Sequence, residues 1–218
     1  MYTLDNLTAR IITCKKCPRL AKYIRTIAKE KVRRYNDWKY WGRPLPGFGD
    51  PYANLLVIGL APAAHGGNRT GRMFTGDSSG DWLMRALHES GFANQYTSEK
   101  KDDGLILKNV YITAIVRCAP PKNKPVTYEI ENCSRYLAEE LKLLKNVKVV
   151  LTLGTLAFNT YASLRKIKGL KFIHAASYDL TDIILIASYH PSRQNTQTGR
   201  LKWNEWIDVF RKINDVIN

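Results

Sequence analysis

Four short apolar runs recur along the chain, each followed by loop-forming residues and then by an amphipathic segment. They lie at residues 54–58, 109–116, 147–153 and 183–188. Continuous apolar runs of this length, bounded by glycine, proline or polar residues, are typical of strands that are buried on both faces. Because amphipathic segments separate the runs, the pattern predicts an α/β fold: a three-layer α/β/α sandwich with a central, mostly parallel four-stranded sheet.

Helical spacing of apolar residues identifies the intervening segments. Leu20, Ile24 and Ile27 predict a helix over residues 18–31 with a basic outer face. Further helices are expected over residues 82–91, 127–144, 155–162 and 203–213. Asp81 and Thr127 are the expected N-caps of the first two. No repeat or composition shift indicates a linker, so we expect one domain over residues 1–218 with an N-terminal arm of about residues 1–50.

A long glycine-rich loop, residues 59–81, follows the first apolar run. Its glycines let the backbone approach a ligand closely. In a parallel sheet, this loop and residues 118–124 and 190–195 leave the same edge, which is where ligands bind in open α/β folds. We therefore expect the active site at that edge.

The charge of the chain is strongly positive. Lysine and arginine number 34 against 19 acidic residues, for a formal net charge of +15. Such a field attracts polyanions, although basic chains that bind none also occur. Residues 33–44 interleave aromatic and basic side chains, which suits either unstacked bases or the edge of a core. No apolar run approaches the ~20 residues that span a bilayer, so we expect a cytoplasmic protein without a membrane partner. We also expect a monomer.

The four cysteines show a spacing of their own. Cys14 and Cys17 form a close pair, whereas Cys118 and Cys133 lie far along the chain. A disulfide framework is not expected in the cytosol. A close pair and two distant cysteines can hold one metal centre, which would tie the N-terminal arm to the body, while four separate buried thiols are the alternative. Zinc and an iron–sulfur cluster both accept four thiolates, so the ligand count leaves the metal open.

Residues 76–80 match the G-x-S-x-G motif of serine hydrolases, which makes Ser78 a candidate nucleophile. That motif requires a strand directly before the serine, and residues 69–75 are a poor strand. A hydrolase would also leave the cysteines and the charge unexplained. The loop lacks the Gly-Lys-Ser/Thr ending of a nucleotide-binding P-loop.

Two longer motifs resemble those of the uracil-DNA glycosylases. They are Gly-Leu-Ala-Pro-Ala-Ala-His-Gly at residues 59–66, with Phe-Thr-Gly-Asp at 74–77, and His-Pro-Ser-Arg-Gln-Asn at 190–195. Together with the four cysteines, they make the chain most similar to the family 5 (type b) branch over nearly its whole length. The resemblance implies a monofunctional DNA-repair glycosylase that flips uracil and other deaminated bases out of DNA and hydrolyses the N-glycosidic bond. It also implies a [4Fe-4S] iron–sulfur cluster on Cys14, Cys17, Cys118 and Cys133.

The resemblance also assigns roles to single residues. His190 is the candidate donor to the base oxygen. Asp77 is the candidate for handling the attacking water, because residues 61–64 are apolar where other branches carry Asp or Asn; capping of the next helix is its alternative role. The remaining candidates bind substrate: Gly59, Ala61, Ala63, Phe74, Asn123, Ser192, Arg193 and Asn195.

Ala114 stands on the second strand where related branches carry an Asn that reads the base edge. A pocket with fewer polar groups discriminates less between bases, so we expect relaxed specificity. Two other functions remain as alternatives: a non-catalytic iron–sulfur protein that binds nucleic acid, and a serine hydrolase that uses Ser78.

Overall fold

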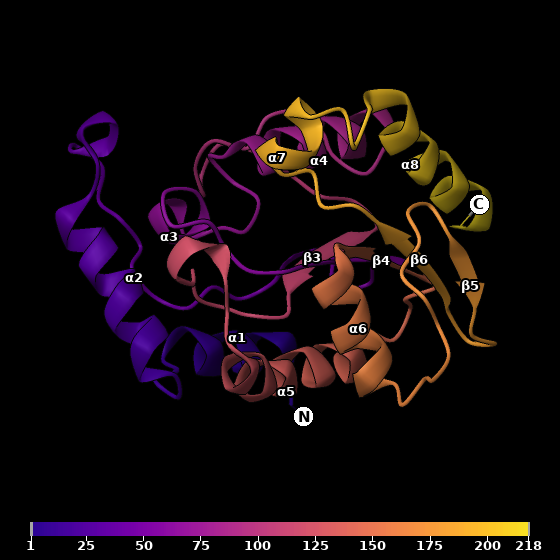
Figure 1. Cartoon of the computed structure of the whole chain (residues 1–218), viewed down its shortest axis with the longest axis horizontal. Coiled ribbons are helices and arrows are strands. Elements are labelled where there is room, and N and C mark those ends of the chain that lie inside the picture. The colour runs from indigo at the N-terminus through magenta and orange to yellow at the C-terminus, as the bar shows by residue number, and fades with distance from the viewer. Residues whose placement is uncertain (1, 218) are drawn as a thin grey trace.

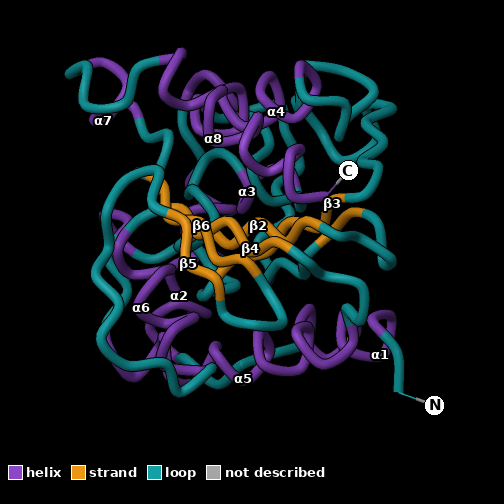
Figure 2. Tube along the Cα trace, turned by 90° about the vertical axis from the view of Figure 1, so that its right-hand side faces the viewer, coloured by secondary structure: helices purple, strands orange, loops and turns teal. Residues whose placement is uncertain are grey.

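The computed structural model describes residues 2–217 and contains one six-stranded sheet between two layers of helices (Figures 1 and 2). The strand order is β1-β3-β2-β4-β6-β5. The inner four strands are parallel: β2 (Leu55–Gly59), β3 (Val110–Ala114), β4 (Val149–Leu153) and β6 (Ile184–Ser188). They coincide with the four apolar runs, so the predicted fold class is confirmed.

The predicted number of strands is wrong. Two short strands, β1 (Phe48–Gly49) and β5 (Ser177–Asp179), pair antiparallel with β3 and β6 at the two edges of the sheet. Strands of two and three residues are too short to show a period, and β5 is largely exposed. Their pairing depends on the neighbouring strand and not on their own sequence.

Each face of the sheet is covered by its own set of helices (Figure 2). One layer contains α1 (Leu4–Ile12), α2 (Pro18–Glu30), α5 (Thr127–Leu143) and α6 (Thr155–Leu164). The other contains α4 (Ser78–Glu89) and α8 (Trp203–Ile217). Within residues 2–217, no helix has both the length and the apolar content to cross a bilayer.

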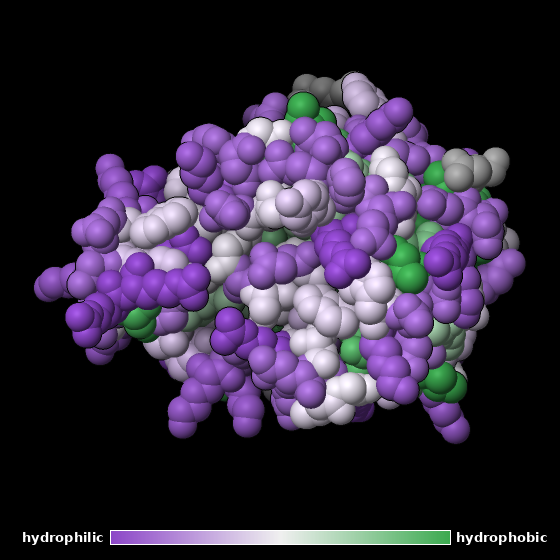
Figure 3. Space-filling view, turned by 90° about the horizontal axis from the view of Figure 1, so that it is seen from above, coloured by the Kyte–Doolittle hydropathy of each residue, from purple (hydrophilic) through white to green (hydrophobic). Residues whose placement is uncertain are grey.

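Short helical segments lie in the loops between these elements. They are α3 (Gly67–Thr70), α7 (Arg193–Gln197) and the 3₁₀ turns Arg33–Tyr35 and Pro121–Asn123. Seen from above, the molecule presents mainly hydrophilic side chains, with small and separate hydrophobic patches (Figure 3).

Two helices begin differently from the prediction. Helix α4 starts at Ser78, and its N-cap is Asp77, whose Oδ1 accepts the backbone N–H groups of Ser79 (3.1 Å) and Gly80 (3.0 Å). The predicted cap Asp81 lies within the first turn. Helix α5 starts at Thr127 itself, after the N-cap Val126, so Thr127 is not the cap either. The N-cap is the last residue of the loop that leads into the helix, next to the free N–H groups of the first turn. The residue at which each loop ends was not evident from the sequence.

A buried ion pair joins the end of β3 to α5. Arg117 donates to Glu140 (2.5 Å) and to the Thr113 hydroxyl (2.5 Å), and that hydroxyl donates to the same carboxylate (2.7 Å). Arg117 and Glu140 are each only 1% exposed. The Arg117 carbonyl also accepts the N–H of Leu45 (2.7 Å). This network therefore fixes three separate segments relative to one another.

Replacing Glu140 with alanine would leave the Arg117 charge buried and unpaired. We expect the free energy of unfolding to fall by about 3–5 kcal/mol, measured by urea denaturation. Glu139→Ala is the matched control on the same helix, because Glu139 pairs with the half-exposed Arg10 and water screens that pair. Equal losses in the two variants would contradict this account of the network.

Candidate active site

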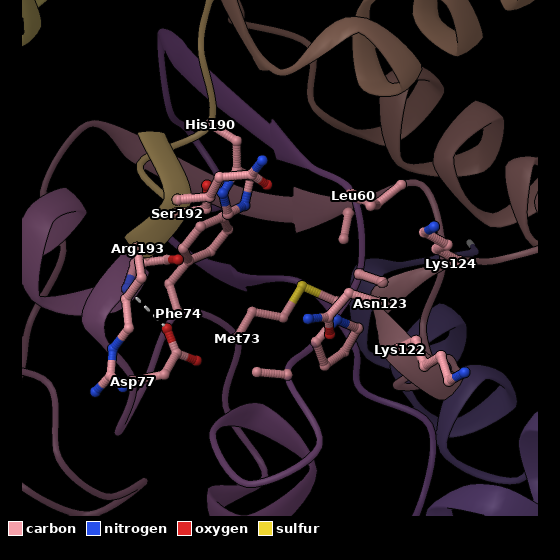
Figure 4. Close-up of a pocket in the computed structure, with 16 residues that line it drawn as sticks. Leu60, Met73, Phe74, Asp77, Lys122, Asn123, Lys124, His190, Ser192 and Arg193 are labelled. Atoms are coloured by element: carbon pink, nitrogen blue, oxygen red, sulfur yellow. Dashed lines mark hydrogen bonds between the residues drawn. The ribbon is translucent and has the colours of Figure 1, made fainter. Parts of the chain in front are cut away.

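A cavity of about 500 Å³ lies at the carboxyl ends of the parallel strands. Its walls come from the loop between β2 and α4, the loop after β3 and the loop after β6 (Figure 4). The three loops that were predicted to share one edge therefore do meet. Eight of the ten candidate catalytic and substrate-binding residues line the cavity: Ala61, Ala63, Phe74, Asp77, Asn123, His190, Ser192 and Arg193.

The other two candidates, Gly59 and Asn195, do not line the cavity but contact residues that do. Gly59 lies against the Phe74 ring, and a Cβ atom at this position would come within 2.7 Å of a ring carbon. The Asn195 side chain donates to the His190 carbonyl (2.8 Å). Both residues therefore support a cavity residue, and neither lines the cavity itself.

His190 and Phe74 pack together on one wall (Figure 4). Their rings are stacked, with centroids 5.8 Å apart and planes at 26°. Burial lowers the pKa of His190 to about 4. The imidazole is therefore neutral at neutral pH, and one ring nitrogen keeps a proton that it can donate. Phe74 has a φ of +49°, a left-handed conformation that a phenylalanine rarely adopts.

Asp77 caps α4, which is the alternative role predicted for it, and it also lines the cavity. Its Oδ1 caps α4, which leaves Oδ2 for the cavity. Oδ2 lies against Gly66, where any Cβ atom would collide with it. Burial raises the pKa of the Asp77 carboxyl above its ordinary value. A carboxylate with a raised pKa is a stronger base, provided that it is still ionised at the working pH.

Asn123 extends into the cavity from the wall opposite Phe74 and His190 (Figure 4). It and Lys122 both have positive φ, +56° and +54°, in the turn after β3. Met73 and Ala114 supply an apolar wall, packed against Leu45. Met73 and Leu60 were not predicted, because a lone apolar side chain carries no chemical signal. Gln194 lies within the motif at residues 190–195, but no role was assigned to it.

A groove of about 560 Å³ adjoins the cavity and shares Asp77, Asn123 and Arg193 with it. Arg34 and Tyr35 from the aromatic-basic segment line its far side. That segment therefore borders the site.

Arg69 holds the aromatic-basic segment against the active-site loop. Its guanidinium lies 4.0 Å from the ring centroids of both Tyr35 and Trp38. It also donates to the carbonyls of His65 (2.7 Å) and Gly76 (3.1 Å). Because Gly76 directly precedes Asp77, one buried cation links the groove to the cavity.

The four cysteines converge in the core between the sheet and the α1, α2, α5 layer. Cys17, Cys118 and Cys133 are buried there, and Cys14 packs against them as a fourth free thiol. Burial raises the pKa of Cys133 to about 11, and the neighbouring Cys14 and Cys17 add to that shift. Two of the sulfurs accept N–H groups, Cys133 from the backbone of Arg117 (3.4 Å) and Cys17 from Asn132 (3.7 Å). In the described part of the chain, no three His, Cys, Asp or Glu side chains lie close enough to hold a single metal ion.

Ser78 lacks the surroundings of a hydrolase nucleophile. It is the first residue of α4 and follows a loop that contains α3, so no strand runs directly into it. None of the hydrogen bonds found across residues 2–217 joins Ser78 to a histidine. The geometry therefore does not support the serine hydrolase alternative.

Comparisons with known proteins identify a family that the chain resembles over most of its length. The model of the uracil DNA glycosylase superfamily matches residues 46–214. A type-5 uracil-DNA glycosylase of Thermus thermophilus is 48% identical over 204 residues, which cover 92% of this chain and 92% of that protein. A type-5 enzyme of Pyrobaculum aerophilum is 44% identical over 208 residues, or 95% and 91% of the two chains. A type-4 uracil-DNA glycosylase of Sulfurisphaera tokodaii is 26% identical over 225 residues, or 99% and 86%.

Phe74 shields His190 from water, so Phe74→Ala is expected to raise the pKa of His190 from about 4 toward its ordinary 6.5. An NMR titration of the His190 ring measures this. Asp77→Asn is the control, because burial alone lowers the pKa of His190 and no neighbouring charge contributes. A pKa that stays near 4 without the Phe74 ring would contradict the assignment of the shift to this packing.

Proposed function

The chain belongs to the uracil-DNA glycosylase superfamily, and we propose that it excises uracil and other deaminated bases from DNA, leaving an abasic site. The observation that carries the proposal is the single cavity that brings together a neutral histidine, a carboxylate and an aromatic ring. The chemistry of these groups matches the steps that excision requires.

The first step is extrusion of the base. A base within a duplex is unreachable, so the enzyme must rotate the nucleotide out of the helix at a cost of a few kcal/mol. A cavity of about 500 Å³ lies in the size range of small-molecule sites. Phe74 supplies an aromatic surface for the extruded base, and the groove beside the cavity receives the adjoining strand.

The second step is cleavage of the N-glycosidic bond. As the bond breaks, positive charge develops on the sugar and negative charge on the departing base. The N–H of His190 donates to the base oxygen and stabilises that charge; in other enzymes the loss of one such donor costs about 3–4 kcal/mol. Asp77 orients the attacking water with the carboxylate oxygen that does not cap α4.

The cavity also accounts for a relaxed choice of base. Leu60, Met73 and Ala114 line it without polar atoms that could read the base edge. Asn123 and Gln194 supply side-chain amides, each of which both donates and accepts. A site with few fixed polar groups rejects wrong bases weakly. We therefore extend the proposed substrates from uracil to other deaminated bases.

DNA binding follows from charge. Arg34, Lys122 and Arg193 line the groove, on a chain with a net charge of +15. Cations at these positions can neutralise backbone phosphates, which positions the strand without reading its sequence.

We also propose that the four cysteines hold an iron–sulfur cluster. The donor set fits such a cluster, because four thiols converge and N–H groups point at two of the sulfurs. A single zinc ion needs each sulfur within about 2.3 Å of the metal, whereas a cluster spans a wider gap with its own iron and sulfide atoms. When bound, the cluster would cross-link the segment between α1 and α2 to β3 and α5, a structural role.

His190→Ala is expected to slow single-turnover cleavage of uracil-containing DNA by about 100- to 1,000-fold while DNA affinity stays nearly the same. The loss arises because only the donor to the departing base is removed. Asp77→Asn should slow cleavage less, since asparagine preserves the cap of α4 and loses only the charge. Ser78→Ala is the control and should matter little. If Ser78→Ala abolished turnover and His190→Ala did not, the assignment would be wrong.

Protein purified without oxygen is expected to be brown and to contain iron. Cys14→Ser should lose both the colour and thermal stability, because one ligand and its cross-link are removed. Thr13→Ser, at the neighbouring position, is the matched control and should keep both. Colourless protein with stoichiometric zinc would overturn the cluster.

A further inference from the structure

A second histidine, His174, holds the backbone just before His190. β5 pairs with β6, and two more backbone hydrogen bonds extend this pairing past the end of β5. The Ala187 N–H donates to the Ala176 carbonyl (3.0 Å), and the Ala175 N–H donates to the Ala187 carbonyl (2.8 Å). At Ala175, where φ is +60°, the chain turns left-handed. The next N–H on this side of β6, that of Tyr189, donates instead to Nδ1 of His174 (3.2 Å). The imidazole thus takes the place of a backbone carbonyl at the end of the ladder.

Tyr189 is held through its side chain as well. Its ring is stacked on the His174 ring, with centroids 4.7 Å apart and planes at 16°. The Arg200 guanidinium lies 4.4 Å from the centroid of the Tyr189 ring. The residue that precedes His190 is therefore fixed both at its backbone and at its ring.

The hydrogen bond determines where His174 carries its proton. Because Nδ1 accepts from Tyr189, the neutral ring has its proton on Nε2, which is buried and has no hydrogen-bond partner among the described residues. Protonation of the ring would place a second N–H on Nδ1, opposite the N–H of Tyr189. Two donors cannot bond to each other, so the contact exists only with neutral His174.

We propose that His174 is a positioning residue for His190: its neutral ring holds Tyr189 and so sets the direction of the His190 donor, and protonation releases that hold. This inference rests on the proposed role of His190 as the donor to the departing base. His174 touches neither substrate nor the reacting atoms in this scheme.

The charged groups around His174 come from α8, and β6 adds a hydroxyl. Glu205, Asp208, Arg211, Lys212 and Asp215 of α8 line the same hollow as the ring, and Lys212 also donates to the Ala175 carbonyl (3.2 Å). The Ser188 hydroxyl of β6 lies 3.3 Å from Nδ1.

Burial is the largest influence and lowers the pKa of His174 below 6.5, with Glu205 opposing the shift and Lys212 adding to it. A histidine with a lowered pKa is neutral at neutral pH. The hold on Tyr189 is therefore complete at neutral pH and is lost as the pH falls below that range.

His174→Asn and His174→Ala test the proposal. The asparagine oxygen can take the place of Nδ1 and accept from Tyr189, but it does not titrate, whereas alanine leaves the N–H without a partner. Single-turnover cleavage of uracil-containing DNA is measured from about pH 5 to pH 8, with DNA affinity measured in parallel. We expect His174→Ala to lose about ten- to a hundredfold in rate at neutral pH with unchanged affinity. His174→Asn should match the wild type there and retain more of its rate in acid.

His88→Asn is the matched control, because His88 also contacts a tyrosine ring but lies on α4, away from Tyr189. It should change nothing. If His174→Ala kept the wild-type rate, or if His174→Asn failed to restore it, the proposal would be overturned. If the alanine variant did not fold, the wild type and His174→Asn would be compared by the fall of their cleavage rates below neutral pH. Identical falls would overturn the proposal.

A readout independent of catalysis separates this proposal from the proposed function. The amide NMR signal of Tyr189 should shift as His174 titrates in the wild type, and this shift should vanish in His174→Asn. If the chemical shift of the Tyr189 amide did not change as His174 titrates, the positioning role would be refuted even in an active glycosylase. Absence of excision by the wild type, with the Tyr189 shift present, would instead refute the proposed function.

Discussion

The buried pair of Arg117 and Glu140 connects the cavity, the sheet and the cysteine cluster. The pair joins β3 to α5. The Arg117 carbonyl also accepts the N–H of Leu45, which packs against Met73 and Ala114 at the cavity. The Arg117 N–H points at the sulfur of Cys133, and Cys118 is the next residue. Buried ion pairs often contribute little net stability compared with apolar packing. The effect of this one is geometric, because it places the cavity wall and two of the four thiols at once.

Burial and close packing set the properties of the side chains that line the cavity. Phe74 packs on His190, and burial lowers the pKa of that histidine to about 4, so the ring is neutral at neutral pH. Gly66 leaves room for the Asp77 carboxylate, whose two oxygens divide between helix capping and the cavity. Arg69 then connects this loop to the aromatic-basic segment through two rings and two carbonyls. The groove and the cavity therefore share one rigid wall.

Several features were predictable from sequence because they depend on local pattern. Strands buried on both faces must be continuously apolar, so the four inner strands were found, and parallel strands place their following loops at one edge. The order of strands and loops along the chain is therefore enough to place Asp77, Asn123 and His190 at the same edge of the sheet. The motif at residues 190–195 and the spacing of the cysteines suggested specific chemical roles, which composition alone does not suggest.

Local sequence pattern thus predicted the parallel core, the edge of the sheet that holds the cavity and half of the residues that line it. The two edge strands, the choice of Asp77 rather than Asp81 as the cap of α4, and the supporting roles of Gly59, Asn195 and His174 became evident only in the folded chain. The physical reason is the range of the contacts involved. Periodicity and motifs indicate what a residue does within its own segment. The packing of the Phe74 ring on Gly59 depends instead on segments that meet only after folding. The same holds for the hydrogen bond between His174 and Tyr189, which lie fifteen residues apart.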